Sequence, residues 1–314
     1  MAADAQQAAG NVQDAAPGAQ QATVDAQQAA VIVQGAAPGA QRATEDMQQA
    51  AVIVACGGSG ARFRGSSAAE HGAGGFAEHS AGAQEAGAGG FAEKQFLMLA
   101  GKPVLAHTLD VLEAHPRVKL IVLVLPQHLV SVGESMAKGH WPAHSGEGDA
   151  YAKVQALLAG GEDRQASVEK GLDALAGLGW RGPVLVQDGV RPCTPSQVYD
   201  RVIEGVLAKG NAVAAIPLRD TVKRADSGGI VCETLDREGL WQIQTPQGFW
   251  MDDLREAYTE GRRRGLRATD DASLVEALGQ RVHLVEGYPA NVKLTYPGDA
   301  ALLEALLQRR QGNV

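Results

Sequence analysis

The sequence predicts an α/β fold with a mostly parallel, doubly wound sheet and a protruding β-arm. Two observations support the sheet: several segments are near-continuous runs of Val, Ile and Leu, and amphipathic segments of helical length separate them. A third observation supports the arm, because the alternation breaks down over residues 219–244. There the pattern changes to short alternating runs around Ser227-Gly228-Gly229, which is typical of a β-hairpin.

The expected elements follow one another along the chain. AVIVA at 51–55 indicates a buried strand, and Pro103 begins a helix that ends before Pro116. Buried strands are predicted at 119–125, 183–188 and 211–218, with helices over 162–176 and 195–210 and a short strand just before residue 160. The domain is completed by helices near 251–263 and 271–278, a strand at 282–286 and a helix at 297–309.

Internal repeats mark the boundaries of the domain. QDAAPGAQQATVDAQQAAVIV (13–33) recurs as QGAAPGAQRATEDMQQAAVIV (34–54), and only the second copy continues into a glycine-rich turn. Residues 1–46 are therefore expected to be a largely disordered leader, with residues 30–33 a spare strand-like segment outside the domain. The domain is expected to span 47–314, and Met47 is an alternative start to Met1. GAGGFAEH (72–79) recurs as GAGGFAEK (87–94), and residues 65–90 are predicted to form a flexible insert.

Composition excludes several classes of function. A formal charge of −8 argues against a general nucleic-acid-binding surface. The three cysteines have no paired spacing, so a reducing compartment, the cytoplasm, is expected. No apolar stretch reaches the length of about 18 residues that a membrane span needs. The first 46 residues are acidic, unlike a targeting peptide.

The stretch CGGSGARF (56–63) follows the first buried strand and is predicted to bind a phosphate through backbone amides, with Arg62 beside it. The dinucleotide pattern fails because Phe63 stands at the third glycine position, and no Gly-Lys-Ser/Thr follows as in a Walker loop. A tight surface turn with solvated arginines is the non-functional alternative.

Several segments together resemble one family, the 2-C-methyl-D-erythritol 4-phosphate cytidylyltransferases, from about residue 50 to the C-terminus. They occur in the family's order and are CGGSGARF, EKQFLMLAGKPVLAHTL, GGEDRQASV, VQDGVRPC, PLRDTVKR, DREGLWQIQTPQ, ATDDASLVE and VEGYPANVKLTYPGD. The resemblance implies a nucleotide-binding α/β domain, a β-arm that forms a homodimer, and Mg²⁺-dependent transfer of CMP from CTP to 2-C-methyl-D-erythritol 4-phosphate.

The resemblance also assigns roles to individual residues. Arg62, Lys94 and Lys293 are expected to be the catalytic cations, which hold the triphosphate and neutralise charge in the transition state. Asp188 would help to position Mg²⁺, which the CTP phosphates mainly hold. The sequence QDGVR departs from the family's usual His-Asp-Ala-Ala at this point. The expected CTP-binding residues are Cys56, Gly57, Gly58, Gly60, Gly161, Arg164, Ser167 and Asp188.

For the acceptor phosphate the resemblance points to a second set of residues. It comprises Thr221, Arg237, Thr245, Thr269 and Asp270, in addition to Lys293. In the family the arginine equivalent to Arg237 reaches the site of the neighbouring subunit. Thr269-Asp270-Asp271 resembles the family's Thr-Asp-Glu segment, and the role of Asp270 stays open.

Two other functions compete with this prediction. A pentitol phosphate cytidylyltransferase, for example one that acts on ribitol 5-phosphate, would share the CTP site and differ around 221–245 and Lys293. A catalytically silent nucleotide-binding protein is the alternative from another class, because the insert separates Arg62 from Lys94. Loop-closure entropy grows slowly with length, so the insert does not by itself prevent the two cations from meeting.

Overall fold

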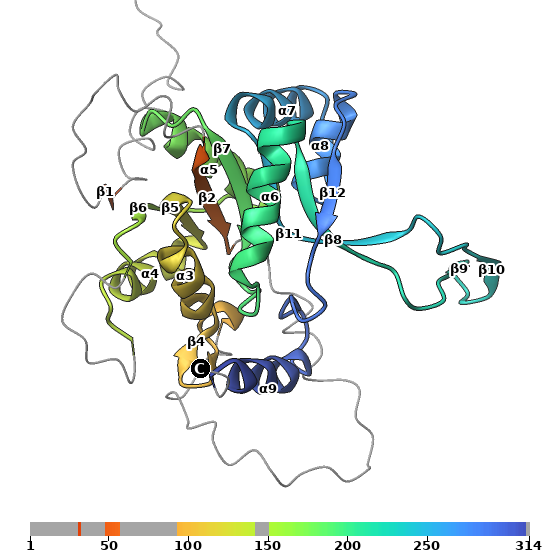
Figure 1. Ribbon diagram of the computed structural model, residues 1–314, viewed down its shortest axis with the longest axis horizontal. Helices are drawn as coiled ribbons and strands as arrows, with labels where there is room; N and C mark the ends of the chain where they lie inside the picture. The colour runs from red at the N-terminus through yellow and green to blue at the C-terminus, as the bar shows by residue number, and fades with distance from the viewer. Residues whose placement is uncertain (1–30, 33–47, 57–92, 142–150, 312–314) are drawn as a thin grey trace, which may run out of the picture.

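The structure is a computed structural model that describes residues 31–32, 48–56, 93–141 and 151–311. Within these residues a single sheet of eight strands forms the centre of the molecule (Figure 1). From one edge to the other its strands are β1 (Val31–Ile32), β6 (Val154–Ala159), β5 (Val118–Leu125), β2 (Ala50–Ala55), β7 (Pro183–Asp188), β11 (Trp241–Trp250), β8 (Ala212–Pro217) and β12 (His283–Glu286).

Most neighbouring strands of this sheet run parallel, as the sequence predicts. The pairs β6–β5, β5–β2, β2–β7 and β8–β12 are parallel. The exceptions are β11, which is antiparallel to both β7 and β8, and β1, which is antiparallel to β6 at the edge. The expected fold class, a mixed α/β domain with a mostly parallel sheet, is therefore confirmed.

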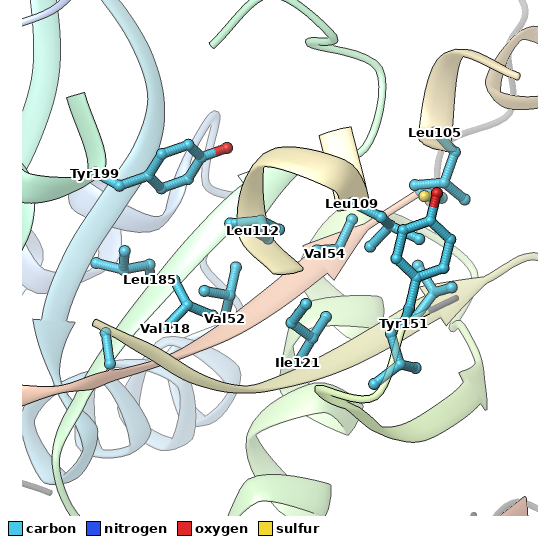
Figure 2. Packing of buried hydrophobic residues seen from close by; sticks show 14 of the residues in the cluster. Val52, Val54, Leu105, Leu109, Leu112, Val118, Ile121, Tyr151, Leu185 and Tyr199 are labelled. Atoms are coloured by element: carbon cyan, nitrogen blue, oxygen red, sulfur yellow. The ribbon is translucent and has the colours of Figure 1, made fainter. Parts of the chain in front are cut away.

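Helices cover both faces of the sheet because its strands alternate their side chains between two apolar layers. Val52 and Val54 of β2 join one cluster together with Leu105 and Leu109 of α3 (Val104–Ala114), as Figure 2 shows. Ile53 faces the opposite way, into a second cluster. That cluster includes apolar residues of α5 (Arg164–Gly177), α7 (Met251–Arg263) and α8 (Asp271–Ala277).

The remaining helices extend these layers. The helix α6 (Ser196–Lys209) packs on the α3 side of the sheet, and α4 (Val130–Ala137) follows the 3-10 turn η3 (Gln127–Leu129). Gly248 of β11 permits the close approach of α6, since a Cβ there would lie 2.5 Å from Cγ1 of Val202. Neither α4 nor the sheet portion of β11 is predicted by the sequence pattern.

A third, smaller cluster fixes the end of the chain near the carboxyl end of β7. Leu303 of α9 (Asp299–Gln311) packs with Val190, Leu294 and Leu99. Leu99 belongs to a small hairpin of β3 (Met98–Leu99) and β4 (Lys102–Pro103), which follows the 3-10 turn η2 (Lys94–Phe96). This cluster therefore connects residues of three distant chain segments around the end of β7.

The predicted hairpin at 219–244 is confirmed. β9 (Lys223–Ala225) and β10 (Val231–Thr234) pair antiparallel at the end of an arm that projects from β8 and β11 (Figure 1). The leader differs from expectation at residues 31–32, which pair with β6 at the sheet edge, whereas residues 30–33 were expected outside the domain. Met47, the insert 65–90 and the rest of the leader lie outside the described residues.

Candidate active site

The candidate site lies at the carboxyl ends of the parallel strands in the middle of the sheet. Asp188 is the last residue of β7 and pairs with Ala55 at the end of β2. Ligands of doubly wound proteins bind at the carboxyl ends of the strands, because the loops that follow neighbouring strands meet there. A cavity of about 320 Å³ opens at this point. Its lining residues are Arg164, Asp188, Arg191, Ile243, Gln244, Thr245, Gln247, Thr269, Asp270 and Lys293.

The carboxylate of Asp188 lies at the centre of a cluster of cations. Its Oδ1 lies 3.3 Å from Nε of Arg164, and its Oδ2 lies 3.2 Å from Nε of Arg191 and 2.9 Å from Nζ of Lys293. Burial alone would raise the pKa of Asp188, but the charges of Lys293, Arg164 and Arg191 outweigh it and hold the pKa well below its usual value. Asp188 is therefore an anion that keeps these cations together.

Backbone contacts bring Lys293 and Arg191 to this carboxylate. The N–H of Leu294 donates to the carbonyl oxygen of Val190 at 3.0 Å, and the Leu294 side chain is fully buried in the third cluster. Lys293 is thereby held beside the turn that follows β7. Arg191 belongs to this turn, and its Nη1 donates to the carbonyl oxygen of Asn291 at 2.7 Å.

Arg164 is the first residue of α5, and its guanidinium contacts two carboxylates. Nη1 and Nη2 donate to Oδ1 and Oδ2 of Asp271 at 3.1 and 2.6 Å, while Nε contacts Asp188. Asp271 also accepts a hydrogen bond from the hydroxyl of Tyr258 in α7. Asp271 is not among the site residues expected from the sequence, although the resemblance of residues 269–271 to the family's Thr-Asp-Glu segment is a signal for it.

Of the residues expected to bind the acceptor, Thr245, Thr269 and Asp270 line the same cavity. The hydroxyl of Thr245 accepts the backbone N–H of Asp188 at 3.1 Å, so its own hydrogen remains for another acceptor. Asp270 caps α8 by accepting from the N–H of Ser273, and it also accepts from Nε2 of Gln247. Gln247 is a further lining residue that the sequence analysis did not identify.

Thr221 and Arg237 belong to the arm and do not line this cavity. Thr221 is exposed, and the exposed Arg237 donates from Nη1 to the carbonyl oxygen of Arg219 at 2.6 Å. Neither residue therefore belongs to the set that surrounds the chain's own Asp188, and Figure 1 shows the arm projecting away from the sheet. The expectation that Arg237 reaches a neighbouring subunit stays a prediction.

Gly161 and Ser167 form the tight connection between β6 and α5. The Ser167 hydroxyl accepts the N–H of Gly161 at 3.1 Å and donates to the carbonyl oxygen of Asp163 at 2.7 Å. Ser167 is fully buried, and a Cβ at Gly161 would lie 2.4 Å from the Cβ of Ala166. These residues therefore shape the loop that presents Arg164, and their expected contact with CTP stays a prediction.

Cys56 lies at the end of β2, buried against the turn after β7. A Cβ on Gly189 would lie 2.3 Å from its Sγ, so the glycine leaves room for the thiol. Burial raises the pKa of Cys56, Asp188 raises it further, and the charge of Lys94 lowers it. Cys56 is therefore a buried, neutral thiol that the charge of Lys94 reaches, and its expected contact with CTP stays a prediction. Gly57, Gly58, Gly60 and Arg62 lie outside the described residues.

Fold and site together define an α/β protein whose sheet edge presents clustered cations to a polyanionic ligand, as in nucleotide-binding enzymes. Comparison with known proteins identifies the family within this class. The family model described as 2-C-methyl-D-erythritol 4-phosphate cytidylyltransferase matches residues 80–309. The chain belongs to the 2-C-methyl-D-erythritol 4-phosphate cytidylyltransferase family, and it is therefore a nucleotidyltransferase.

Individual relatives agree with this assignment. Proteins of that name from Dehalococcoides mccartyi and Geotalea uraniireducens are 42% and 41% identical to the chain, over 69% and 68% of it and over 89% and 88% of their own lengths. The crystal structure of the protein of that name from Thermus thermophilus is 34% identical, with a TM-score of 0.55 over 68% of this chain and 94% of that one. The family predicted from the sequence motifs is confirmed.

Proposed function

We propose that the chain transfers CMP from CTP to 2-C-methyl-D-erythritol 4-phosphate, giving 4-diphosphocytidyl-2-C-methyl-D-erythritol and pyrophosphate, a step of non-mevalonate isoprenoid synthesis. The observation that carries the proposal is the cavity around Asp188, where Arg164, Arg191 and Lys293 converge at the carboxyl edge of the sheet. The relatives' names support this acceptor and do not favour ribitol 5-phosphate.

In this reaction a phosphate oxygen of the acceptor attacks the α-phosphorus of CTP. The new P–O bond forms while the bond from the α-phosphorus to the bridging oxygen breaks, and pyrophosphate carries away the electron pair. Negative charge gathers on the α-phosphate and on the leaving oxygen, so cations that are already in place stabilise the transition state. Lys293, Lys94 and Arg62 are the cations to which we assign this role.

The polar groups of the cavity would position the two substrates. Asp188 holds Lys293 and the two arginines in position before CTP arrives. The Thr245 hydroxyl, whose oxygen already accepts a backbone N–H, would donate its hydrogen to a phosphate oxygen of the acceptor. Thr269 and Asp270 line the same cavity. Gly161, Arg164 and Ser167 would contact the cytosine and ribose of CTP.

The donor set fits a magnesium ion only in a limited way. No group of three His, Cys, Asp or Glu side chains suited to a metal occurs in the part of the chain that the structure describes. Asp188 has about four acceptor positions, and the nearby cations take up three of them. Asp188 therefore has one acceptor position left, which could contact a water bound to the metal. The CTP phosphates would supply the main ligands of Mg²⁺, and the bound ion would reduce the negative charge of these phosphates. Asp188 would orient that ion.

We also propose that the chain forms a homodimer through its β-arm. Every residue of β9 and β10 is exposed, including Val231, and the neighbouring Ile230 is 67% exposed. In an isolated monomer most of the surface of these apolar side chains stays in water, so a partner that covers them is expected. In the dimer Arg237 and Thr221 would complete the acceptor site of the partner.

The cytoplasm is the compartment that we propose for the protein. Cys56, Cys193 and Cys232 are all free thiols, as expected in a reducing compartment. Within the described residues, no helix combines the length and apolar character that crossing a bilayer requires.

Release of pyrophosphate from CTP tests the proposed function directly. CTP and Mg²⁺ are incubated with the full chain and with 2-C-methyl-D-erythritol 4-phosphate or ribitol 5-phosphate in separate reactions. We expect turnover with the first acceptor and little with the second. Preference for ribitol 5-phosphate would replace the acceptor that we propose. Binding of CTP without turnover on either acceptor would indicate a catalytically silent nucleotide-binding protein.

A further inference from the structure

Asp271 does not line the cavity, yet it is among the most constrained residues around it. Its side chain is fully buried, and it pairs with Arg164 through two parallel hydrogen bonds. Burial, together with the charge of Asp271, raises the pKa of Tyr258 well above its usual value, so the phenol stays protonated and donates to the carboxylate. A buried carboxylate is stable only when such partners replace its hydration.

The geometry divides the donors of Arg164 between two carboxylates. A guanidinium has five N–H groups: Asp271 takes one from each Nη atom, and Asp188 takes the one on Nε. One N–H on each Nη atom remains for a substrate. The cavity wall includes Arg164, so these donors belong to a residue that borders the ligand space.

We infer that Asp271 is a positioning residue of the nucleotide site, which acts through Arg164 to fix the carboxylate of Asp188 and, with it, Lys293. The inference rests on the proposed function. It connects the beginning of α8, where Asp271 follows the N-cap residue Asp270, to the end of β7. Asp271 itself does not line the cavity.

Loss of the Asp271 charge would redistribute the contacts around Asp188. With Asp271 present, Arg164 gives Asp188 a single N–H, and the other carboxylate oxygen is left to Arg191 and Lys293. In Asp271→Asn the amide keeps one acceptor oxygen, so one Nη donor of Arg164 loses its partner and can turn toward Asp188. A guanidinium prefers to bind a carboxylate through two bonds, so it would then compete with Lys293 for Oδ2.

The substitution Asp271→Asn tests the inference because it removes the charge and nearly keeps the shape. We expect kcat/KM for CTP to fall by about tenfold or more, since small displacements of catalytic groups have effects of this size. Asp271→Glu keeps the charge but moves the carboxylate by one methylene, so its kcat/KM should lie between those of Asp271→Asn and the unmodified chain.

A double-mutant cycle with Arg164→Lys separates positioning from general stability. Lysine keeps the positive charge but cannot form the paired bonds to Asp271. If Asp271 acts through Arg164, then Asp271→Asn should lower kcat/KM much less in the Arg164→Lys background than in the unmodified chain. Equal losses in both backgrounds would overturn the inference.

Asp110→Asn is the matched control. Asp110 of α3 also accepts from a tyrosine hydroxyl and a cation, Tyr151 and Lys102, and it does not line the candidate site. This variant should lose stability without losing kcat/KM for CTP. If Asp271→Asn behaves in the same way, and retains kcat/KM below its unfolding temperature, Asp271 is a structural residue only and the inference is wrong.

Asp271→Ser, assayed with and without formate, gives a second and independent readout of the same ion pair. Formate is a carboxylate small enough to pair with Arg164 in the vacated space. Recovery of kcat/KM by formate, and not by chloride, supports the inference, whereas a folded variant whose kcat/KM formate does not raise contradicts it. Failure of the unmodified chain to turn over CTP would contradict the proposed function instead, because the inference concerns only ratios between variants.

Discussion

At the scale of single residues, Asp188 organises the site by charge. It is almost fully buried, and its contacts with Arg164, Arg191 and Lys293 place positive charge where a triphosphate would bind. A fixed arrangement of this kind needs no reorganisation when CTP arrives, which is the main advantage of an electrostatic catalyst. The arrangement leads to predictions about pH and about the catalytic cations.

Stability should depend on pH through Asp188. The pKa of Asp188 is lowered in the folded state, whereas in the unfolded chain it is about 3.9. At pH values between these two pKa values the unfolded chain binds a proton that the folded chain does not, so the free energy of unfolding falls as the pH falls. Asp188→Asn should lower the free energy of unfolding by about 3 kcal/mol near pH 7, because the cations lose a buried partner. Urea unfolding at pH 7, 5, 4 and 3 gives the free energy of unfolding of the unmodified chain and of Asp188→Asn. The difference between the two should become smaller only below about pH 4.

The exposed substitution Asp252→Asn on α7 serves as the control, and it should show little effect at any of these values. A difference between the unmodified chain and Asp188→Asn that stays constant down to pH 3 would contradict the low pKa assigned to Asp188.

Lys94→Ala should lower kcat by about a hundredfold or more, which is typical when one stabilising group is removed from a transition state. Lys94 is half-buried at the start of η2, and its charge acts on Cys56 at the end of β2. Initial rates of pyrophosphate release measure the effect, with the exposed Lys209→Ala at the end of α6 as the control. A Lys94→Ala variant that keeps most of its activity would remove Lys94 from the catalytic cations.

Several of these residues could be predicted from the sequence, and others could not. Asp188 and Arg164 follow from their motifs, because a polar residue at the end of a buried strand or at the start of a helix is a local signal. The pairing of Arg164 with Asp271 joins positions 107 apart in the chain, and that of Asp188 with Thr245 joins positions 57 apart. Local periodicity carries no information about such contacts.

At the scale of elements, the apolar strands and the long helices could be predicted because their side-chain period alone determines them. The sheet portion of β11 contains Pro246 and Gly248, both unfavourable in strands, and packing against α6 overrides that preference. The helix α4 is short and contains Gly133, so its local signal is weak.

Removal of residues 66–88 should leave turnover largely intact. The described residues on either side, Cys56 and Lys94, lie near enough for the charge of Lys94 to influence the Cys56 thiol, so a shorter connection can join them. The entropy of loop closure also changes slowly with loop length. Steady-state rates of the deletion variant and the full chain provide the measurement, and a loss of activity comparable to that of Lys94→Ala would show that the insert takes part in the reaction.

At the scale of the whole molecule, the arm predicts a dimer that the sequence motifs also imply. Val231→Asp in β10 should shift the chain from dimer to monomer, because a charge replaces an exposed apolar side chain at the proposed contact. Light scattering after size exclusion measures the mass. The matched substitution Leu302→Asp, at an exposed position of α9, should leave the dimer intact. A full-length chain that is monomeric at assay concentrations would contradict the dimer.

A crystal structure of the full chain with bound CTP tests the central claim most directly, since that claim is the convergence of cations from distant segments on one nucleotide. We predict that the triphosphate lies in the cavity beside Asp188, with Arg62, Lys94 and Lys293 at hydrogen-bonding distance of about 3 Å from its oxygens. A nucleotide bound elsewhere, for example in the cavity lined by Arg309 and Arg310, would contradict the account. So would a triphosphate in the predicted place that none of the three cations contacts.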